Sequence, residues 1–262
     1  MIVLKGRYPW RLGTTSFIVP AGMNENVRLL STLVDDVQLL FFESRANSEL
    51  EHPLDINSLK WLAGDHDLSY TVHLPIDLHL GSHSRRIRDE AITEIIDLMT
   101  KLAPLAPSCF DLHLLRELNV AESQWLDCLN DSLGELADRL GDERGKIAIE
   151  NIDYPFQSVR SLVLNHGFSL CLDFGHGLRY GEDLEQMLNY IPQAAHIHYH
   201  GAAEGRDHLA VDSHQDEMSV GLAEKLSDYC FSGVVTLEVY SLERLKESYQ
   251  TLAKAWNTHE RK

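Results

Sequence analysis

The sequence has few cysteines, few basic residues and no long apolar run. The four cysteines, Cys109, Cys128, Cys171 and Cys230, are far apart and form no CxxC pair, so they predict reduced thiols rather than a disulfide framework. No stretch approaches the roughly 20 apolar residues of a membrane helix. The N-terminus lacks the long apolar core of a signal peptide. We therefore expect a cytoplasmic protein with no membrane partner.

The shortage of basic residues argues against a nucleic-acid partner. The chain carries 23 Lys and Arg against 40 Asp and Glu, a formal net charge of −17. Such a surface repels nucleic acid, because Lys and Arg contacts to phosphate supply most of the affinity. One basic cluster, Arg85-Arg86-Ile-Arg88, lies in a helical stretch and is typical of a solvated helix face. Part of the negative charge would be offset by carboxylates that bind divalent cations.

Two common catalytic motifs are also missing. The segment after the first predicted strand reads Gly13-Thr-Thr-Ser16, which is not the GxGxxG of a dinucleotide-binding fold. The chain contains no GxSxG, so a serine nucleophile elbow is excluded. Nothing in the sequence indicates a cysteine nucleophile.

What the chain does contain is an alternation of strand-like and helical segments. Amphipathic helices are predicted over 87–102, 126–140 and 242–256, and Gly141 supplies a stop for the second. Eight strand-like segments cover residues 12–17, 37–43, 69–74, 109–114, 146–151, 169–174, 195–200 and 234–240. This alternation, without a low-complexity linker, predicts a single (β/α)8 TIM-barrel domain over residues 1–262.

A doubly wound open sheet is the alternative fold. Its strands would be uniformly apolar, whereas the strand interiors here are not. Small and polar residues occupy one strand face, which suits a tapering barrel lumen: Thr71, Asp111, Ala148, Cys171 and Thr236. We therefore prefer the barrel.

Six of the strand-like segments end in a side chain that can bind a metal. These residues are His73, His113, Glu150, Asp173, His198 and Glu238, and each follows an apolar residue. The two neighbours point to opposite faces of a strand, and parallel barrel strands bring their C-terminal ends to one rim. Imidazole and carboxylate together suit Zn²⁺, or alternatively Mn²⁺ or Fe²⁺. Glu150 could bridge two ions about 3.5–4 Å apart, and we expect two or three ions.

Two loops add further candidates. Asp173-Phe-Gly-His176 places a second possible ligand three residues on, with Gly175 permitting a turn. After the seventh strand, Asp207 and His208 form a pair that could hold a further metal or orient a water.

The remaining candidates are assigned by role. We predict that Glu150, Glu238 and His176 carry the catalysis. Substrate-binding residues are predicted at Glu43, His200 and Arg206; the arginine would steady an anionic oxygen. Which of Asp207, His208 and His200 are ligands stays open. His196 shares the face of His198 but lies deeper, and we leave it out of the site.

With these residues at its strand ends, the chain resembles members of the xylose isomerase-like barrel superfamily. That superfamily includes endonuclease IV and sugar isomerases and epimerases. The metal-binding pattern of endonuclease IV, carried over, falls on His73, His113, Glu150, Asp173, His176, His198, Asp207 and/or His208, and Glu238. Two departures stand out. The Asp-Arg-His loop of the endonuclease is Arg206-Asp207-His208 here, and its long basic DNA-wedging loops have no counterpart.

Several separate segments are also similar to the cobamide-remodelling phosphodiesterases of that superfamily. They are Gly13-Thr-Thr-Ser16, 37–43, 70–75, 171–176, 198–201 with Asp207-His208, and 237–240. Those enzymes cleave the nucleotide loop of vitamin B12-type cofactors. The resemblance implies a metal-dependent phosphodiesterase whose substrate is a cobamide-like small molecule.

Two alternatives stay open alongside the hydrolase. A sugar isomerase or epimerase would use one metal and two carboxylates, such as Glu150 and Glu238, to move a proton beside a carbonyl. A degenerate barrel would only bind a ligand. An epimerase usually needs only the ligands of strands five to eight, so His73 and His113 favour the multi-metal hydrolase. The oligomeric state is not indicated.

Overall fold

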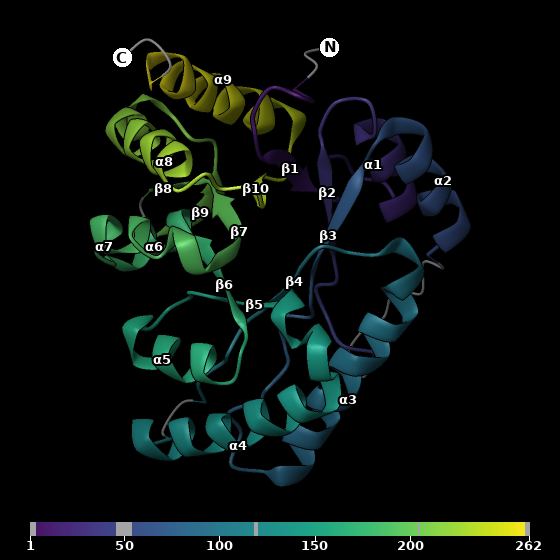
Figure 1. Cartoon of the computed structure of the whole chain (residues 1–262), viewed down its shortest axis with the longest axis vertical. Coiled ribbons are helices and arrows are strands. Elements are labelled where there is room, and N and C mark those ends of the chain that lie inside the picture. Colours follow the sequence, from purple (N-terminus) through teal and green to yellow (C-terminus); the bar gives the residue numbers. More distant parts are fainter. Residues whose placement is uncertain (1–3, 46–53, 118–119, 204, 260–262) are drawn as a thin grey trace.

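Eight parallel strands close into a barrel in the computed structural model, which describes residues 4–45, 54–117, 120–203 and 205–259. The strand order around the barrel is β1-β10-β7-β6-β5-β4-β3-β2, so the predicted barrel is confirmed and the open sheet is excluded (Figure 1). The strands are β1 (Arg11–Thr15), β2 (Asp36–Leu40), β3 (Ser69–His73), β4 (Phe110–Leu112), β5 (Ile147–Glu150), β6 (Ser169–Asp173), β7 (Ala194–Tyr199) and β10 (Val234–Leu237).

Helices surround the barrel. They are α1 (Met23–Leu30), α2 (Ile56–His66), α3 (Arg85–Leu102), α4 (Glu122–Leu140), α5 (Gln157–Asn165), α6 (Phe174–Tyr180), α7 (Leu184–Leu188), α8 (Asp216–Asp228) and α9 (Leu242–His259). Short 3₁₀ turns are η1 (Ala103–Leu105), η2 (Gly141–Lys146), η3 (Ile191–Gln193) and η4 (Ser213–Gln215). The three predicted amphipathic helices correspond to α3, α4 and α9, and α4 ends where Gly141 adopts a positive φ of 56°. No helix in the described residues is long and apolar enough to span a membrane.

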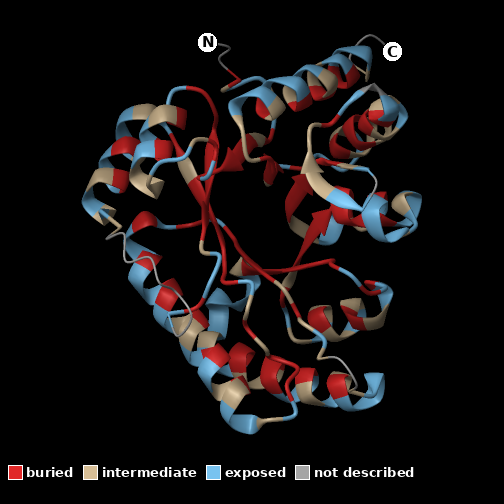
Figure 2. Cartoon of the chain, turned by 180° about the vertical axis from the view of Figure 1, so that it is seen from behind, coloured by how far each residue is buried: buried red, intermediate tan, exposed pale blue. Residues whose placement is uncertain are grey.

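The core lies between the barrel and its helices. Figure 2 shows buried residues along the strands and on the barrel-facing sides of the helices. Leu129, Leu133 and Leu136 of α4, spaced for one helix face, are fully buried. Inside the barrel the expected small and polar lining is present, since Thr71, Asp111, Ala148, Cys171 and Thr236 are all 0 % exposed. The lumen is therefore a packed and partly polar interior.

One part of the fold was not predicted from the sequence. The loop after β7 forms a two-stranded antiparallel sheet, β8 (Gly201–Ala203) and β9 (Arg206–Leu209). Gly205, with a φ of +76°, lies in its turn. The hairpin carries Asp207 and His208 back toward the barrel mouth, which places loop residues beside the strand ends.

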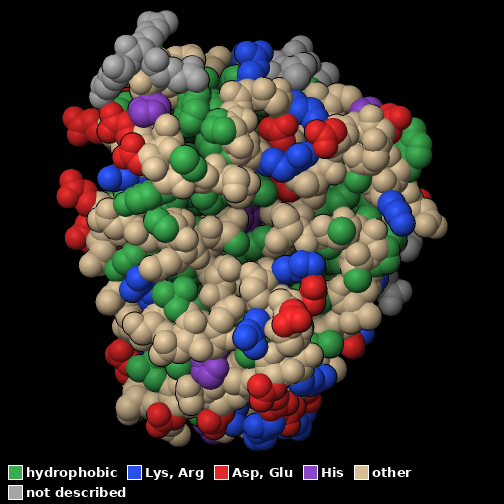
Figure 3. All heavy atoms as spheres, in the orientation of Figure 1, with side chains coloured by type: hydrophobic (Ala, Val, Ile, Leu, Met, Phe, Trp, Pro, Cys, Tyr) green, Lys and Arg blue, Asp and Glu red, His purple; other side chains and the backbone are tan. Residues whose placement is uncertain are grey.

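The basic cluster on α3 is paired with acidic groups. Arg85 contacts Asp89 and Glu135, and Arg86 contacts Glu90. Arg88 is buried and donates to the carbonyl of Ser82 at 2.8 Å. Figure 3 shows Lys and Arg side chains scattered among acidic ones over the face it presents. Arg85 and Arg86 are exposed on the helix face, as predicted, whereas the prediction of a solvated side chain was wrong for Arg88, which is buried.

Candidate metal centre

The side chains at the strand ends converge at one mouth of the barrel. His73, Glu150 and Asp173 are the last residues of β3, β5 and β6, while His113 and Glu238 directly follow β4 and β10. Sheet register places neighbours side by side, and Asp173 of β6 is paired with His198 of β7. The structure thus brings together all six side chains that the strand pattern singled out. They form overlapping groups whose possible ligand atoms lie within 4.8 Å of one another.

The first group consists of His73, His113 and Glu150. The Nε2 atoms of His73 and His113 lie 3.3 and 3.2 Å from Oε2 of Glu150. His73 Nδ1 lies 2.8 Å from the carbonyl of Leu74. A carbonyl only accepts hydrogen bonds, so Nδ1 carries the proton and Nε2 is left free to bind a metal.

The second group consists of Glu150, Asp173, His198 and Glu238. His198 Nδ1 lies 3.2 Å from Oε2 of Glu238, 3.5 Å from Oε1 of Glu150 and 3.6 Å from Oδ2 of Asp173. Glu150 belongs to both groups: Oε2 faces the first and Oε1 faces the second. A carboxylate with its two oxygens turned toward different ligand sets has the geometry of a bridge between two ions.

The third group consists of His176, His200 and His208. The His200 ring centroid is 5.5 Å from that of His176 and 4.3 Å from that of His208. His200, predicted to bind substrate, is fully buried and its Nε2 lies 3.2 Å from Asp173. This position is that of a ligand candidate.

Asp207 has a different partner from the one expected. Its carboxylate is paired with Arg179 of α6 and lies 3.8 Å from His176 Nε2 and 3.9 Å from His208 Nε2. His208 adopts a left-handed backbone with a φ of 51°, which is uncommon outside glycine and is often found at functional sites. The hairpin β8–β9 therefore contributes His208 directly, while Asp207 lies at the edge of the third group.

The Asp-Phe-Gly-His segment works differently from the sequence expectation. There is no turn at Gly175, because α6 starts at Phe174 and Asp173 caps it by accepting the His176 N–H at 2.7 Å. Gly175 is needed for space, since a Cβ there would collide with the His200 ring. Helix capping thus places His176 beside Asp173. The absence of a side chain at Gly175 leaves room for the His200 ring.

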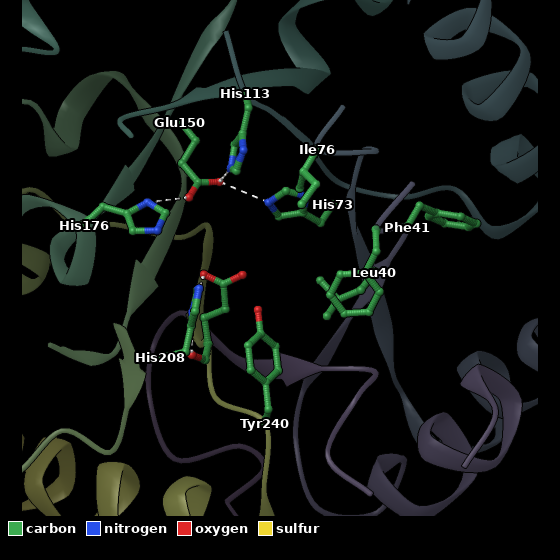
Figure 4. A pocket seen from close by; sticks show the side chains of 11 residues that line it. Leu40, Phe41, His73, Ile76, His113, Glu150, His176, His208 and Tyr240 are labelled. Atoms are coloured by element: carbon green, nitrogen blue, oxygen red, sulfur yellow. Dashed lines mark hydrogen bonds and ion pairs between the residues drawn. The ribbon is translucent and has the colours of Figure 1, made fainter. Parts of the chain in front are cut away.

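Six residues of these groups line one side of a pocket with a cavity volume of about 130 Å³: His73, His113, Glu150, His176, His208 and Glu238. Figure 4 shows His73, His113, Glu150 and His176 turned toward one another on that side. Leu40 and Ile76 line the other side, the Phe41 ring is turned away from the cavity, and the Tyr240 hydroxyl points into the space between. The apolar side was not predicted from the sequence.

A match that covers most of the sequence identifies the family. A model of the xylose isomerase-like TIM barrel family matches residues 30–257. The chain belongs to this family. A search among curated proteins gave no significant match.

Solved structures of similar fold include both enzyme classes of the superfamily. A D-tagatose 3-epimerase-like protein is 20% identical, with a TM-score of 0.76 over 96% of this chain and 98% of its own. The IolI protein, whose structure holds a zinc atom, is 17% identical, with a TM-score of 0.71 over 96% and 98%. Endonuclease IV from Thermus thermophilus is 18% identical, with a TM-score of 0.68 over 95% and 99%. The TM-scores establish a shared fold, and at identities this low the comparison shows the fold alone.

The residues of this xylose isomerase-like barrel fit divalent metal ions. Four buried atoms of the centre have no hydrogen-bond partner among the described residues: His113 Nε2, Glu150 Oε2, His198 Nδ1 and Glu238 Oε2. They approach one another closely but without the alignment of hydrogen bonds. Leaving a buried polar group unsatisfied costs about 1–3 kcal/mol. Divalent cations would satisfy all four, and this mixture of nitrogen and oxygen donors suits Zn²⁺, Mn²⁺ or Fe²⁺.

The carboxylates are held in their ionised form. Burial acts to raise the pKa of Glu150, but His198 and His113 outweigh it and bring the pKa well below its usual value. Burial likewise acts to raise the pKa of Asp173, and His176 and His200 reverse the effect. These carboxylates are therefore charged at neutral pH and ready to bind a cation.

The histidines are correspondingly basic in the metal-free protein. Burial acts to lower the pKa of His73, but Glu150 raises it to about 9. Burial also acts to lower the pKa of His176, and Asp173 with Glu150 raises it to about 10. Both rings are protonated at pH 7 without metal, so metal binding must displace these protons.

A second layer of polar side chains lies below the groups in the lumen. His196, which we left out of the site, is fully buried with Nδ1 2.8 Å from Asp111 and Nε2 2.7 Å from Thr236. Gln38 donates to Asp111 at 3.0 Å, and its amide nitrogen lies 2.7 Å from His198 Nε2. These contacts fix the ring of His198 from behind and leave its Nδ1 turned to the carboxylates. The sequence signal was Asp111 and His196 on the ligand-bearing strand face.

None of the three residues predicted to bind substrate is part of the pocket lining: His200 is buried in the third group, and the other two are exposed. Glu43 is exposed because β2 ends at Leu40, three residues earlier than the predicted limit. Arg206 is exposed on β9. Their roles remain predictions.

Proposed function

We propose that the protein is a metal-dependent phosphodiesterase that hydrolyses the nucleotide loop of a cobamide. The observation that carries the proposal is the shared carboxylate of Glu150, which faces two ligand groups with its two oxygens. Two metal sites joined by a bridging carboxylate suit an in-line displacement at phosphorus, in which both the attacking and the leaving oxygen need charge stabilisation.

The residues of this chain would share the work as follows. Glu150 would contribute to both sites, His73 and His113 would complete one, and Asp173, His198 and Glu238 would complete the other. His176, His200 and His208 offer a third site. Bound divalent cations would supply Lewis-acid chemistry, activating water and neutralising the charge that develops on phosphorus.

The second layer would fix the geometry of this arrangement. Asp111 and Gln38 hold the His198 ring from behind, so that Nδ1 faces Glu238 and Glu150. The Asp173 cap fixes the start of α6 and with it the position of His176. A preorganised set of donors reduces the reorganisation needed during the reaction.

Charge favours a small-molecule phosphodiester over a nucleic acid. The formal net charge of −17 opposes a polyanion, and Arg85 and Arg86 already pair with carboxylates. The cobamide itself rests on the resemblance of the strand-end segments to the cobamide-remodelling group.

A sugar epimerase or isomerase is the second candidate. The group of Glu150, Asp173, His198 and Glu238 by itself gathers three carboxylates and a histidine around one site. Solved structures of the same fold include a D-tagatose 3-epimerase-like protein and an L-ribulose 3-epimerase. Against this, His73 and His113 would have no evident task in a reaction that needs only one metal.

The test is to incubate metal-replete protein with adenosylcobalamin and to separate the products by chromatography. Hydrolysis adds one water across a P–O bond, so the expected products are a cobinamide-type corrinoid and the lower-ligand fragment, with the phosphate on one of them as a monoester. Separate samples loaded with Zn²⁺, Mn²⁺ or Fe²⁺ identify the active ion. Glu247→Gln serves as a matched acidic control, because its exposed carboxylate lies on α9, outside the pocket lining.

Two results would decide against the phosphodiesterase. One is intact cobamide with every metal, together with turnover of a keto sugar, which selects the epimerase. The other is full cobamide cleavage by metal-free Glu150→Gln protein, since that result would place the chemistry outside this centre.

A further inference from the structure

Large apolar side chains are exposed mainly at the barrel mouth. In the described part of the chain, Phe17, Phe42, Ile76 and Leu242 lie within five residues after β1, β2, β3 and β10, and Leu178 and Tyr180 lie on α6 after β6. Only Trp61 of α2 and Tyr229, which follows α8, are exposed elsewhere among the large apolar side chains described. Exposed apolar surface gathered at one place indicates a binding surface.

Three of these mouth residues form a continuous surface with the pocket. Phe42 and Ile76 line it and are 42 and 44 % exposed. Phe17, 46 % exposed, meets Phe42 edge to face with ring centroids 5.3 Å apart and Tyr240 at 6.3 Å. We define the apolar wall as Phe17, Leu40, Phe42 and Ile76. Leu40, Phe42 and Ile76 line the same pocket as the ligand groups, and Phe17 extends the wall through its contact with Phe42.

Tyr240 stands at the border between the two sides. Its hydroxyl points into the cavity (Figure 4), and we find no hydrogen-bond partner for it among the described residues. The hydroxyl can donate a hydrogen bond to an oxygen of a bound molecule without adding charge.

We propose that the apolar wall binds a flat, uncharged ring of the substrate, next to the phosphodiester that reaches the metal centre. This inference rests on the proposed function and specifies its substrate: a phosphodiester carrying an unsaturated ring. A ring is favoured because aromatic side chains that meet edge to face offer both a ring face and a ring edge. The wall is continuous with the catalytic pocket, so its occupant is part of the molecule that reacts.

Other occupants explain the wall less well. A membrane surface carries negative charge and would be repelled by a net charge of −17. A protein partner or second copy of the chain seated on the wall would also close the cavity in front of Glu150, which the substrate must reach.

The test compares two non-hydrolysable probes, phenylphosphonate and methylphosphonate, by titration calorimetry on the metal-loaded full chain. Both offer the same anionic group to the metals and differ in the ring. We expect phenylphosphonate to bind at least tenfold more tightly, the equivalent of about 1.4 kcal/mol. Phe42→Ser and, as a second variant, Ile76→Ser should each reduce that preference to about threefold or less.

Matched controls separate the wall from general effects. Trp61→Ser removes an exposed aromatic side chain that lies outside the pocket lining and should leave the preference unchanged. Tyr240→Phe keeps the ring and should retain it too. Equal affinity for the two probes in the wild-type protein, no measurable binding of either, or a preference that survives both wall variants would overturn the proposal.

The outcome is distinguishable from that of the cobamide assay. A ring preference that depends on Phe42, without cobamide cleavage, would support ring binding by the apolar wall and exclude the cobamide as substrate. Cobamide cleavage with no ring preference would support the phosphodiesterase and overturn ring binding by the wall. A mass twice that of the chain by light scattering, lost in Phe42→Ser, would assign the wall to a second copy and overturn the proposal.

Discussion

Replacing Glu150 by glutamine tests the centre of the arrangement. The carboxylate is 1 % exposed, and four histidine nitrogens lie within 3.5 Å of it, from His73, His113, His176 and His198. The amide keeps the shape and loses the negative charge. Because both of its oxygens face ligand groups, the substitution weakens two metal sites at once. We expect bound metal to fall by at least one equivalent from two or three, and hydrolysis to be lost.

The same change should destabilise the metal-free protein. The pKa of Glu150 in the folded protein lies below its unfolded value, so its stabilising contribution is present at pH 7 and is lost only as pH falls through the folded pKa. Removing one partner of a buried charge pair typically costs about 3–5 kcal/mol, because the partner charges stay buried. At about 2 °C per kcal/mol for a chain of this size, the melting temperature should fall by roughly 6–10 °C.

The assay measures metal content by mass spectrometry of dialysed protein and the melting temperature after chelation. Glu247→Gln is the matched control, since it makes the same chemical change at an exposed carboxylate and should alter neither quantity. An unchanged metal content and near-native turnover in Glu150→Gln would refute the bridging role. A melting temperature unchanged in the metal-free variant would refute the charge pairing.

Three further predictions follow from the second layer, the histidines and the surface. Asp111→Asn should weaken metal binding about 10- to 100-fold by loosening His198, measured by competition with a chelating dye, while ligand-free protein stays folded by circular dichroism. The pKa values of His73 (about 9) and His176 (about 10) exceed the unfolded value of 6.5, so their stabilising contribution in metal-free protein is complete below pH 6.5 and lost as pH rises through 9–10. Metal affinity should therefore rise from pH 7 to pH 9 with proton release, and calorimetry in buffers of different ionisation enthalpy showing no proton release would contradict this. Finally, an abasic-site duplex should neither bind tightly nor be nicked; tight, salt-sensitive binding would restore an endonuclease interpretation.

The sequence by itself determined the barrel and most of the candidate ligand set. Strands alternate their faces, so an apolar residue followed by His73, Glu150 or Asp173 fixes which side chain turns inward. Parallel strands in a closed barrel bring their C-terminal ends together whatever the loops do. The local alternation of residues along the strands therefore predicted that six side chains, up to 165 residues apart in the sequence, lie close together.

Only the tertiary structure decided which loop residues join them. The β8–β9 hairpin and the space left by Gly175 bring His208 and His200 into the third group, although the sequence suggested substrate binding for His200. Three residues of loop beyond the end of β2 leave Glu43 exposed.

The second layer and the apolar wall were likewise decided by packing. His196 has both ring nitrogens engaged, by Asp111 from β4 and Thr236 from β10, and no local pattern indicates that pairing. Phe42 and Ile76 follow different strands and meet at the mouth only because β2 and β3 are neighbours in the closed sheet. The periodicity of a strand predicts which way a side chain points. The neighbours of that side chain depend on strand order and loop path, which are set by contacts between residues distant in sequence.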